Sequence, residues 1–306
     1  MKAVLFPGQG SQYVGMASDF YKKFDSVKKN FETVDKALGY SLSTLILNGP
    51  EEDLKLTQNT QPAIMTVGVA IFNVLNKNLN FNLKNAKFFA GHSLGEYTAL
   101  VCSGSLTIER AAYLLKERGK AMQEAVPAGQ GSMIAILGMT IEEVEKELKL
   151  LPSKEVCEIA NDNTNGQVVV SGTRNANDIL NKNLKKKRKR CITLPVSAPF
   201  HCSLMKKAAE YMKKKIEDTI FLKPNPNIIS NITAKEEPDI NRIKPLLIDQ
   251  ITSTVRWRES VNYMIKQGVN EFLEIGPGKV LSGLVKKINR DVKVSNINYI
   301  EDIKND

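Results

Sequence analysis

Apolar residues along the chain fall into short continuous runs of strand length and longer stretches with helical spacing. The strand-like runs lie at residues 2–6, 88–91, 227–232 and 271–275. Helical stretches separate them, including one through residue 47 and others at 63–75, 107–124, 240–250 and 259–266. Because strands alternate with helices, the pattern predicts an α/β fold with a mostly parallel sheet.

The pattern changes in the middle of the chain. Strand-like runs at 133–137, 155–160, 167–171 and 191–196 enclose helical stretches at 140–150 and 175–186. This βαββαβ order is the ferredoxin-like arrangement. We therefore predict two domains: an α/β-hydrolase-like parallel-sheet large domain made of residues 1–126 and 200–306, and a ferredoxin-like small domain, residues 127–199, inserted into it.

The run at 88–91 ends in Gly91-His92-Ser93-Leu94-Gly95 and passes directly into a helical stretch. A G-x-S-x-G motif between a strand and a helix is typical of the nucleophile elbow, whose glycines remove Cβ atoms that would crowd the serine. Ser93 would then stand at a helix N-terminus, where backbone N–H groups favour negative charge on an attacked carbonyl. The alternative is a glycine-flanked serine in an ordinary loop.

Two further side chains are notable for their positions. His201, one of only two histidines, follows a strand-like run at the start of a helical stretch, so it can reach the sheet edge where Ser93 is expected. A capping or surface histidine is the alternative. Arg118 falls on the apolar stripe of the helix predicted from Thr107 to about Glu124. It would either bind a ligand carboxylate, or snorkel to water or pair with a core acid.

Two motifs that would indicate a cofactor are incomplete. The glycine-rich turn at 7–12 is followed by Tyr13 where a dinucleotide loop needs glycine, and the turn at 276–280 carries Val280 where a P-loop has serine or threonine. The four cysteines lack a spacing suited to zinc and are expected to be reduced thiols. The sequence therefore predicts neither a cofactor nor a metal site. The turn at 7–12 is expected instead to present backbone N–H groups to a substrate.

Composition and charge limit the location and the partners. Hydrophobic content of 42% and charged content of 25% are ordinary for a soluble globular protein. No apolar run approaches the ~20 residues that span a bilayer, and the strand-like start leaves no room for a signal peptide, which predicts a cytoplasmic location without membrane contact. The net charge of +10 favours acidic partners. Part of this charge is concentrated in Lys185, Lys186, Lys187, Arg188, Lys189 and Arg190.

That basic run, residues 185–190, has three interpretations. It is either a solvated helix end, a docking patch for an acidic partner, or a nucleic-acid contact. The last is disfavoured because low-complexity flanks and interleaved aromatic residues are missing around it.

Six motifs stand together in an order and spacing found in one family. They are Pro7-Gly8-Gln9-Gly10-Ser11-Gln12, Thr60-Gln61-Pro62-Ala63, Gly91-His92-Ser93-Leu94-Gly95-Glu96-Tyr97, Arg118-Gly119, Pro199-Phe200-His201 and Glu274-Ile275-Gly276-Pro277-Gly278-Lys279. Through these motifs, from residue 2 to about residue 287, the chain resembles the malonyl-CoA:acyl carrier protein transacylases of bacterial fatty acid synthesis.

The resemblance implies catalytic roles. Ser93 would be the nucleophile that carries a malonyl ester, and His201 would be the general base. The acid of a hydrolase triad is missing, because Asp162 and Asp178 fall inside the predicted insertion. Gln250 matches the family residue whose carbonyl orients the histidine instead.

The resemblance also implies residues that hold the substrate. Gln9 and Leu94 would form the oxyanion hole through their backbone N–H groups. Arg118 would pair with the free carboxylate of the malonyl group, which explains its place on an apolar stripe. His92 is expected to shape the elbow turn, and it is assigned together with Gln61 to substrate binding.

The implied reaction is ping-pong transfer of a malonyl group from malonyl-CoA to the phosphopantetheine thiol of acyl carrier protein. Acyl carrier proteins are acidic, which gives the run at 185–190 a partner, and the enzyme is expected to be a monomer. A serine esterase or thioesterase of the α/β-hydrolase type would share Ser93 and His201 but leaves Arg118 and Gln250 unexplained. A nucleic-acid-binding module explains only the basic run. An acyltransferase domain of a polyketide synthase shares every motif, but the free-standing length argues against it.

Overall fold

The computed structural model of the chain describes residues 1–196 and 198–303. Within these residues six strands form a large sheet. All neighbouring strands are parallel except the last pair in the spatial order, which is antiparallel. The predicted α/β architecture with a mostly parallel sheet is confirmed. In spatial order the strands are β10 (Lys293–Ile297), β9 (Glu271–Ile275), β1 (Lys2–Phe6), β2 (Phe88–Gly91), β7 (Asn227–Ile229) and β8 (Glu236–Glu237).

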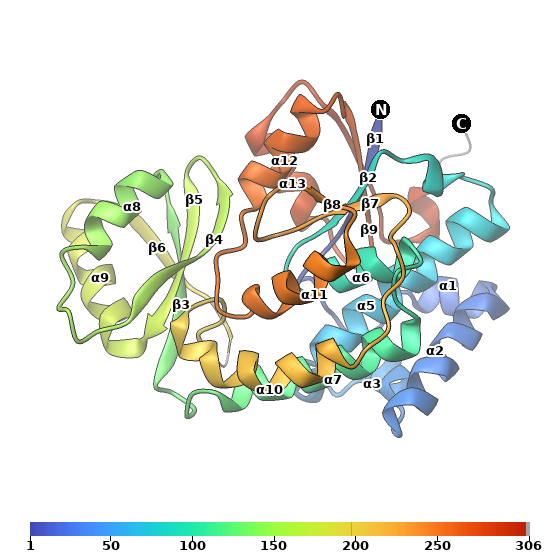
Figure 1. Ribbon diagram of the computed structural model, residues 1–306, viewed down its shortest axis with the longest axis horizontal. Coiled ribbons are helices and arrows are strands. Elements are labelled where there is room, and N and C mark those ends of the chain that lie inside the picture. Colours follow the sequence, from blue (N-terminus) through green and yellow to red (C-terminus); the bar gives the residue numbers. More distant parts are fainter. Residues whose placement is uncertain (197, 304–306) are drawn as a thin grey trace.

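Both faces of the large sheet are buried, as expected for parallel strands covered by their crossover helices. Val4 and Phe6 of β1 belong to one core, whereas Ala3 and Leu5 belong to the other. Figure 1 shows α5, α6 and α7 on one side of this sheet and α12 and α13 on the opposite side. Among the helices of the described residues, none has the length and apolar character needed to cross a membrane.

The helices that contribute to the first core are α1 (Ser18–Lys23), α2 (Asp25–Leu38), α3 (Leu42–Asn48), α4 (Glu51–Leu54), α5 (Thr57–Asn73), α6 (Gly95–Cys102), α7 (Ile108–Glu124), α10 (Lys206–Glu217) and α11 (Ile240–Asp249). Those that contribute to the second core are α12 (Trp257–Lys266) and α13 (Val280–Ile288). Shorter turns are η1 (Val74–Asn78), η2 (Leu83–Asn85), η3 (Ser203–Met205) and η4 (Ile300–Asp302).

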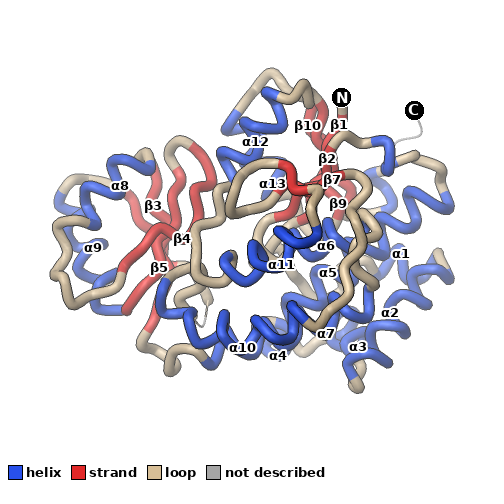
Figure 2. The backbone as a smooth tube through the Cα atoms, in the orientation of Figure 1, coloured by secondary structure: helices blue, strands red, loops and turns tan. Residues whose placement is uncertain are grey.

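A second, antiparallel sheet stands beside the first (Figure 2). Its strand order is β4-β5-β3-β6, and its helices α8 and α9 connect β3 to β4 and β5 to β6, so the predicted ferredoxin-like arrangement is confirmed. The domain boundaries at residues 127 and 199 stay a prediction. The elements are β3 (Gly131–Leu137), α8 (Ile141–Leu148), β4 (Cys157–Thr164), β5 (Gln167–Thr173), α9 (Arg174–Lys186) and β6 (Arg190–Thr193).

Each face of the small sheet has a different neighbour. Ile134 and Val170 pack against α8 and α9 in a core of the small domain. Met133 and Val169, whose side chains point the opposite way, join the first core of the large domain. Because successive side chains of a strand point to opposite faces, one face of the small sheet packs on α8 and α9 and the other face packs on the large domain.

Several element boundaries differ from the expected ones. Strand β4 begins and ends later than predicted: its end stays paired with β5 through Asp162 and Thr164, and Asp162 N–H also donates to the Val255 carbonyl at 3.0 Å. Helix α5 begins at Thr57, five residues before Pro62. Tertiary contacts fix that early start, since Thr57 N–H donates to Gln123 Oε1 of α7 at 3.0 Å. Packing against α7 thus overrides the boundary that the proline suggests.

Candidate active site

Ser93 lies on the turn between β2 and α6, with φ of 54° in the left-handed region. The flanking glycines are required by close backbone contacts. A Cβ on Gly91 would lie 1.9 Å from the Gly95 carbonyl carbon, and a Cβ on Gly95 would lie 2.2 Å from the Phe6 carbonyl oxygen. The turn therefore has the geometry that the G-x-S-x-G motif predicts, with the serine held at the start of a helix.

Ser93 contacts a histidine that comes from far along the chain. Ser93 Oγ lies 2.8 Å from His201 Nε2, and His201 Nδ1 lies 2.8 Å from the Gln250 carbonyl oxygen. A carbonyl oxygen can only accept, so Nδ1 must carry the proton and Nε2 must present its lone pair to the serine hydroxyl. The expected order of Ser93, His201 and the Gln250 carbonyl is present in the structure as a continuous hydrogen-bonded chain.

Arg118 is fully buried beside Ser93, so it does not snorkel to water. Its guanidinium donates to Gln61 Oε1 at 2.7 Å, to Gln250 Oε1 at 2.9 Å and to Ser93 Oγ at 3.2 Å. Within residues 1–196 and 198–303 no carboxylate oxygen lies within 4.0 Å of its nitrogens, and its Nε–H has no acceptor. A buried guanidinium with only neutral partners lacks the counter-charge that such a group normally has.

Close to Arg118 lies a buried carboxylate, Glu96, for which no role was predicted. Glu96 Oε2 accepts from Gln250 Nε2 at 2.7 Å and from Asn231 N–H at 3.1 Å. Burial raises the pKa of Glu96 to about 7, although these hydrogen bonds and the charge of Arg118 oppose the shift. Gln250 therefore serves twice: its backbone carbonyl faces His201, and its side chain links Glu96 to Arg118.

The electrostatic surroundings keep His201 neutral. Burial, followed by the positive charge of Arg118, lowers the pKa of His201 to about 3, against the hydrogen bond to Gln250. At neutral pH the imidazole is therefore unprotonated and can accept a proton at Nε2. Neutralising Arg118 with a ligand carboxylate would remove one of the charges that disfavour the imidazolium.

Two backbone N–H groups near Ser93 are free to bind a ligand oxygen. Within the described part of the chain, the amides of Gln9 and Leu94 donate to no protein acceptor. A Cβ on Gly8 would lie 2.7 Å from the His92 carbonyl oxygen, so the turn that carries Gln9 packs directly on the elbow. Gln9 lines the same cleft as Ser93, and Leu94 directly follows Ser93 on the elbow.

The remaining walls of the cleft combine polar and apolar side chains. His92 is half-buried and lines the cleft; its Nε2 lies 3.0 Å from Asn163 Oδ1 and its ring packs near Trp257. Gln61 lines the cleft and accepts from Arg118, as described above. The apolar lining comes from Met122, Met133, Leu194, Val196 and Phe200.

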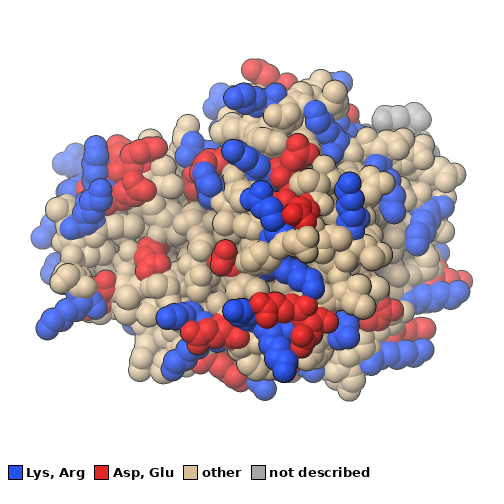
Figure 3. Space-filling model, in the orientation of Figure 1, with Lys and Arg blue, Asp and Glu red and all other residues tan. Residues whose placement is uncertain are grey.

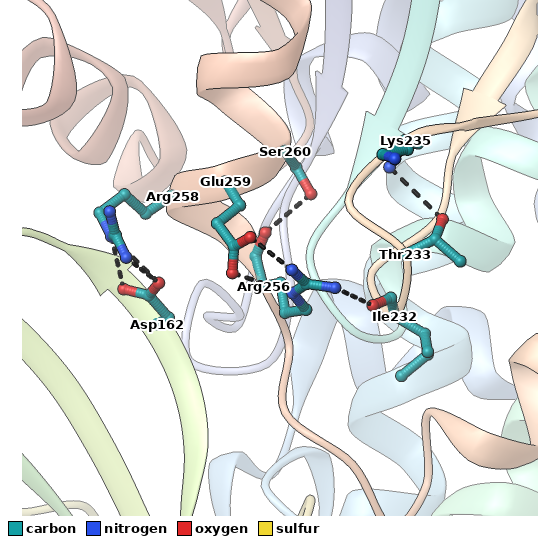
Figure 4. A network of polar contacts seen from close by, with 8 residues as sticks. All are labelled: Asp162, Ile232, Thr233, Lys235, Arg256, Arg258, Glu259 and Ser260. Atoms are coloured by element: carbon teal, nitrogen blue, oxygen red, sulfur yellow. Dashed lines mark hydrogen bonds and ion pairs between the residues drawn. The ribbon is translucent and has the colours of Figure 1, made fainter. Parts of the chain in front are cut away.

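In the described part of the chain, neither aspartate of the predicted insertion hydrogen-bonds to His201. Asp162 is buried and accepts from Arg258 of α12 at 2.9 and 3.0 Å, which ties β4 to the large domain (Figure 4). Asp178 is exposed on α9. The two residues therefore have other positions in the fold, in agreement with a triad that lacks an acid.

The basic run at 185–190 covers the end of α9 and the start of β6. Lys187 pairs with Glu147 at 2.6 Å, and Lys189 donates to the Gly138 carbonyl at 3.2 Å. Figure 3 shows basic side chains at the outer edge of the small domain, with acidic ones beside them. The other four cations of the run, Lys185, Lys186, Arg188 and Arg190, are exposed.

Comparison with known proteins agrees with this geometry. The sequence model of the family described as "Acyl transferase domain" matches residues 4–303. The chain belongs to the acyl transferase family. It is 43% identical to the malonyl CoA-acyl carrier protein transacylase of Bacillus subtilis (strain 168), over 99% of this chain and 95% of that relative. The match extends beyond residue 287, where the predicted resemblance ended.

Solved structures of acyl transferases are similar over nearly the whole fold. The acyl-carrier-protein-S-malonyltransferase of Bartonella henselae superposes with a TM-score of 0.95 at 42% identity, covering 98% of this chain and 96% of that one. A malonyl-transacylase in complex with a type II PKS acyl-carrier protein gives a TM-score of 0.94 at 38% identity, covering 98% and 97%.

Sequence reasoning about this acyl transferase missed the polar layer under the elbow. Glu96 and Asn231 are both almost fully buried and both contact Gln250. A glutamate two residues after the elbow leucine, inside an apolar helix start, was a usable signal, because a carboxylate there must be paired or have a raised pKa. Asn231 had no such signal: the run predicted at 227–232 placed it inside a strand, whereas β7 ends at Ile229 and Asn231 lies in the turn that follows, where asparagine is ordinary.

Proposed function

We propose that this acyl transferase moves a malonyl group from malonyl-CoA to the thiol of acyl carrier protein through an ester on Ser93. The observation that carries the proposal is Arg118, a fully buried guanidinium with neutral partners beside the hydroxyl of Ser93. A malonyl thioester supplies both a carbonyl for the serine and a free carboxylate for the guanidinium. The malonyl transfer named for the relatives supports the same substrate.

In the first half-reaction, Ser93 Oγ attacks the thioester carbonyl while its proton passes to His201 Nε2. The N–H groups of Gln9 and Leu94 stabilise the negative charge on the former carbonyl oxygen. When the tetrahedral intermediate collapses, the carbon–sulfur bond breaks and the CoA sulfur takes the proton from His201. The product is a malonyl ester on Ser93.

In the second half-reaction, His201 takes the proton of the carrier-protein thiol, whose sulfur attacks the ester carbonyl. Collapse returns the acyl group to sulfur and the proton to Ser93 Oγ. Since burial and the charge of Arg118 lower the pKa of His201 to about 3, the substrate carboxylate on Arg118 assists both steps by removing a repulsive charge from the imidazolium. The Gln250 carbonyl keeps the proton on Nδ1 throughout.

The acceptor and the surroundings of the reaction follow from the same proposal. Acyl carrier protein as acceptor is supported by the related malonyl-transacylase solved in complex with a carrier protein. We propose the exposed cations of the run at 185–190 as part of its docking surface. A cytoplasmic location and a monomeric state stay predictions.

Intact-mass measurement after incubation with malonyl-CoA tests the proposal. The native chain is expected to gain the mass of one malonyl group and to lose it when carrier protein with a free phosphopantetheine thiol is added. Ser93→Ala is expected to gain no mass. Absence of acylation in the native chain, or acylation of Ser93→Ala, would refute the proposal. Hydrolysis of simple esters without CoA-dependent exchange would favour a serine esterase.

A further inference from the structure

Asn231 lies two residues after the end of β7, and its buried side chain reaches under the nucleophile elbow. Its Nδ2–H donates to the Gly91 carbonyl at 2.8 Å, and its Oδ1 accepts from Ser93 N–H at 2.8 Å. One amide side chain therefore bridges the two ends of the segment Gly91-His92-Ser93. Its donor and its acceptor thus satisfy one backbone carbonyl and one backbone N–H of the turn.

The bridged segment contains a backbone conformation that serine adopts rarely. Ser93 has φ of 54°, a left-handed value that is unfavourable for a non-glycine residue and persists only where the surroundings hold it. The same conformation directs Ser93 Oγ to within 2.8 Å of His201 Nε2. We propose that Asn231 is a positioning residue for the nucleophile: it holds Ser93 in this conformation and so keeps Oγ within reach of the base. This inference rests on the proposed role of Ser93.

Asn231 is itself fixed by contacts on its backbone. Its N–H donates to Glu96 Oε2 at 3.1 Å, and its carbonyl accepts from Arg256 N–H at 3.0 Å. Figure 4 shows the Arg256 guanidinium donating to the carbonyl of Ile232, the next residue, while Glu259 holds the same guanidinium in place. Both backbone groups and both side-chain ends of Asn231 are thus engaged, which leaves the side chain no alternative direction.

The bridge also determines which amides can stabilise the oxyanion. Because Ser93 N–H is bonded to Asn231, that group is not available to a substrate oxygen. Among the residues that the structure describes, no acceptor bonds to the neighbouring amide of Leu94 or to that of Gln9. Two neighbouring N–H groups of the elbow therefore have different roles. Ser93 N–H bonds to Asn231 and holds the turn, whereas Leu94 N–H is available to bind the substrate oxygen.

Single-turnover acylation measures the positioning directly. We compare the native chain with Asn231→Ala, which removes the bridge, and Asn231→Asp, which keeps an acceptor for Ser93 but loses the donor for Gly91. The rate constant for malonyl ester formation is followed by quenched intact mass at saturating malonyl-CoA, at a temperature where the circular dichroism spectra of all variants match. The expected loss is about 10²-fold for Asn231→Ala, because a displacement near 1 Å costs about that much. Asn231→Asp is expected to lose less.

Other readouts separate positioning from a general loss of rigidity. The KM for malonyl-CoA and the ratio of malonyl to acetyl transfer should stay at native values, since Asn231 is absent from the cleft lining and Arg118 does not bond to it. The matched control is Asn177→Ala, an equally buried asparagine of α9 that donates to Ser132 O and Oγ at 2.7 and 2.8 Å. It should lower the melting temperature and leave the acylation rate unchanged.

Three results would overturn the inference. They are a native acylation rate in Asn231→Ala, an equal loss of rate in Asn177→Ala, and a loss confined to malonyl transfer. A native chain that forms no ester in the same assay would refute the proposed function instead, so the two failures are distinguishable.

Discussion

Replacing Arg118 with alanine removes a fully buried guanidinium that donates to Gln61, Gln250 and Ser93. A malonyl group bound in the variant would leave its carboxylate buried without a counter-charge. Breaking one side of a buried ion pair costs about 3–5 kcal/mol. At about 1.4 kcal/mol per tenfold, kcat/KM for malonyl-CoA should fall by about 10²- to 10⁴-fold.

Acetyl transfer should respond differently to the same change. Acetyl-CoA has no carboxylate, so in the native chain it leaves Arg118 unpaired and gains nothing from it. The charge of Arg118 is also one cause of the lowered pKa of His201, so its removal makes the imidazole a stronger base. We therefore expect acetyl transfer by Arg118→Ala to equal or exceed the native value.

The assay measures kcat/KM for transfer from malonyl-CoA and from acetyl-CoA to carrier protein in parallel. Arg118→Lys keeps the charge but lacks the planar fork, so its malonyl activity should fall between those of the native chain and Arg118→Ala. Arg110→Ala is the matched control, because it removes an exposed cation from the same helix and should leave both activities unchanged. An equal loss of malonyl and acetyl transfer in Arg118→Ala would refute the reasoning.

Three further predictions concern charge, pH and packing. The pKa of Glu96 is raised from 4.5 to about 7, so the native free energy of unfolding should lose up to about 3 kcal/mol from this group as pH rises between those values, a component that urea denaturation should find missing in Glu96→Gln. Reversing the exposed charges of the run at 185–190 should raise the KM for carrier protein, more so at low salt, and leave acylation by malonyl-CoA unchanged; an unchanged KM would exclude the run from the interface. Gly95→Ala should lower the melting temperature strongly, since its Cβ would lie 2.2 Å from the Phe6 carbonyl oxygen. Gly283→Ala in α13, with nothing within 4 Å of the added Cβ, should instead stabilise by about 0.5–1 kcal/mol, and equal melting shifts in the two variants would contradict the packing argument.

Edge strands show where the sequence pattern carries too little information. Strand β10 is largely exposed or half-exposed, and β8 is only two residues long, so neither has the continuous apolar run that marks β9 or β1. Their pairing is fixed by the neighbouring strand that is already in place. Periodicity identifies a strand by the surface it buries, and an edge strand buries little.

Local sequence determined the features whose physical causes act over a few residues. The elbow needs glycines on both sides of Ser93 because backbone atoms come within 2.2 Å of where a Cβ would be, and that requirement is visible in the letters G-x-S-x-G. The βαββαβ order of the small domain follows from the change of hydrophobic period along 131–193. The position of Arg118 on an apolar stripe was equally visible, because helical spacing alone places it there.

Only the tertiary structure decided how the buried polar groups pair. Gln250 bonds to Glu96 across 154 positions of sequence, and Asn231 bonds to Ser93 across 138. The hydrophobic periodicity of the sequence does not predict contacts between residues so far apart, because their hydrogen bonds form only when the strands and helices have packed. A buried donor or acceptor must find a partner wherever the fold brings one, so the sequence could predict the serine, the histidine and the arginine, whereas the fold alone decided what holds them in place.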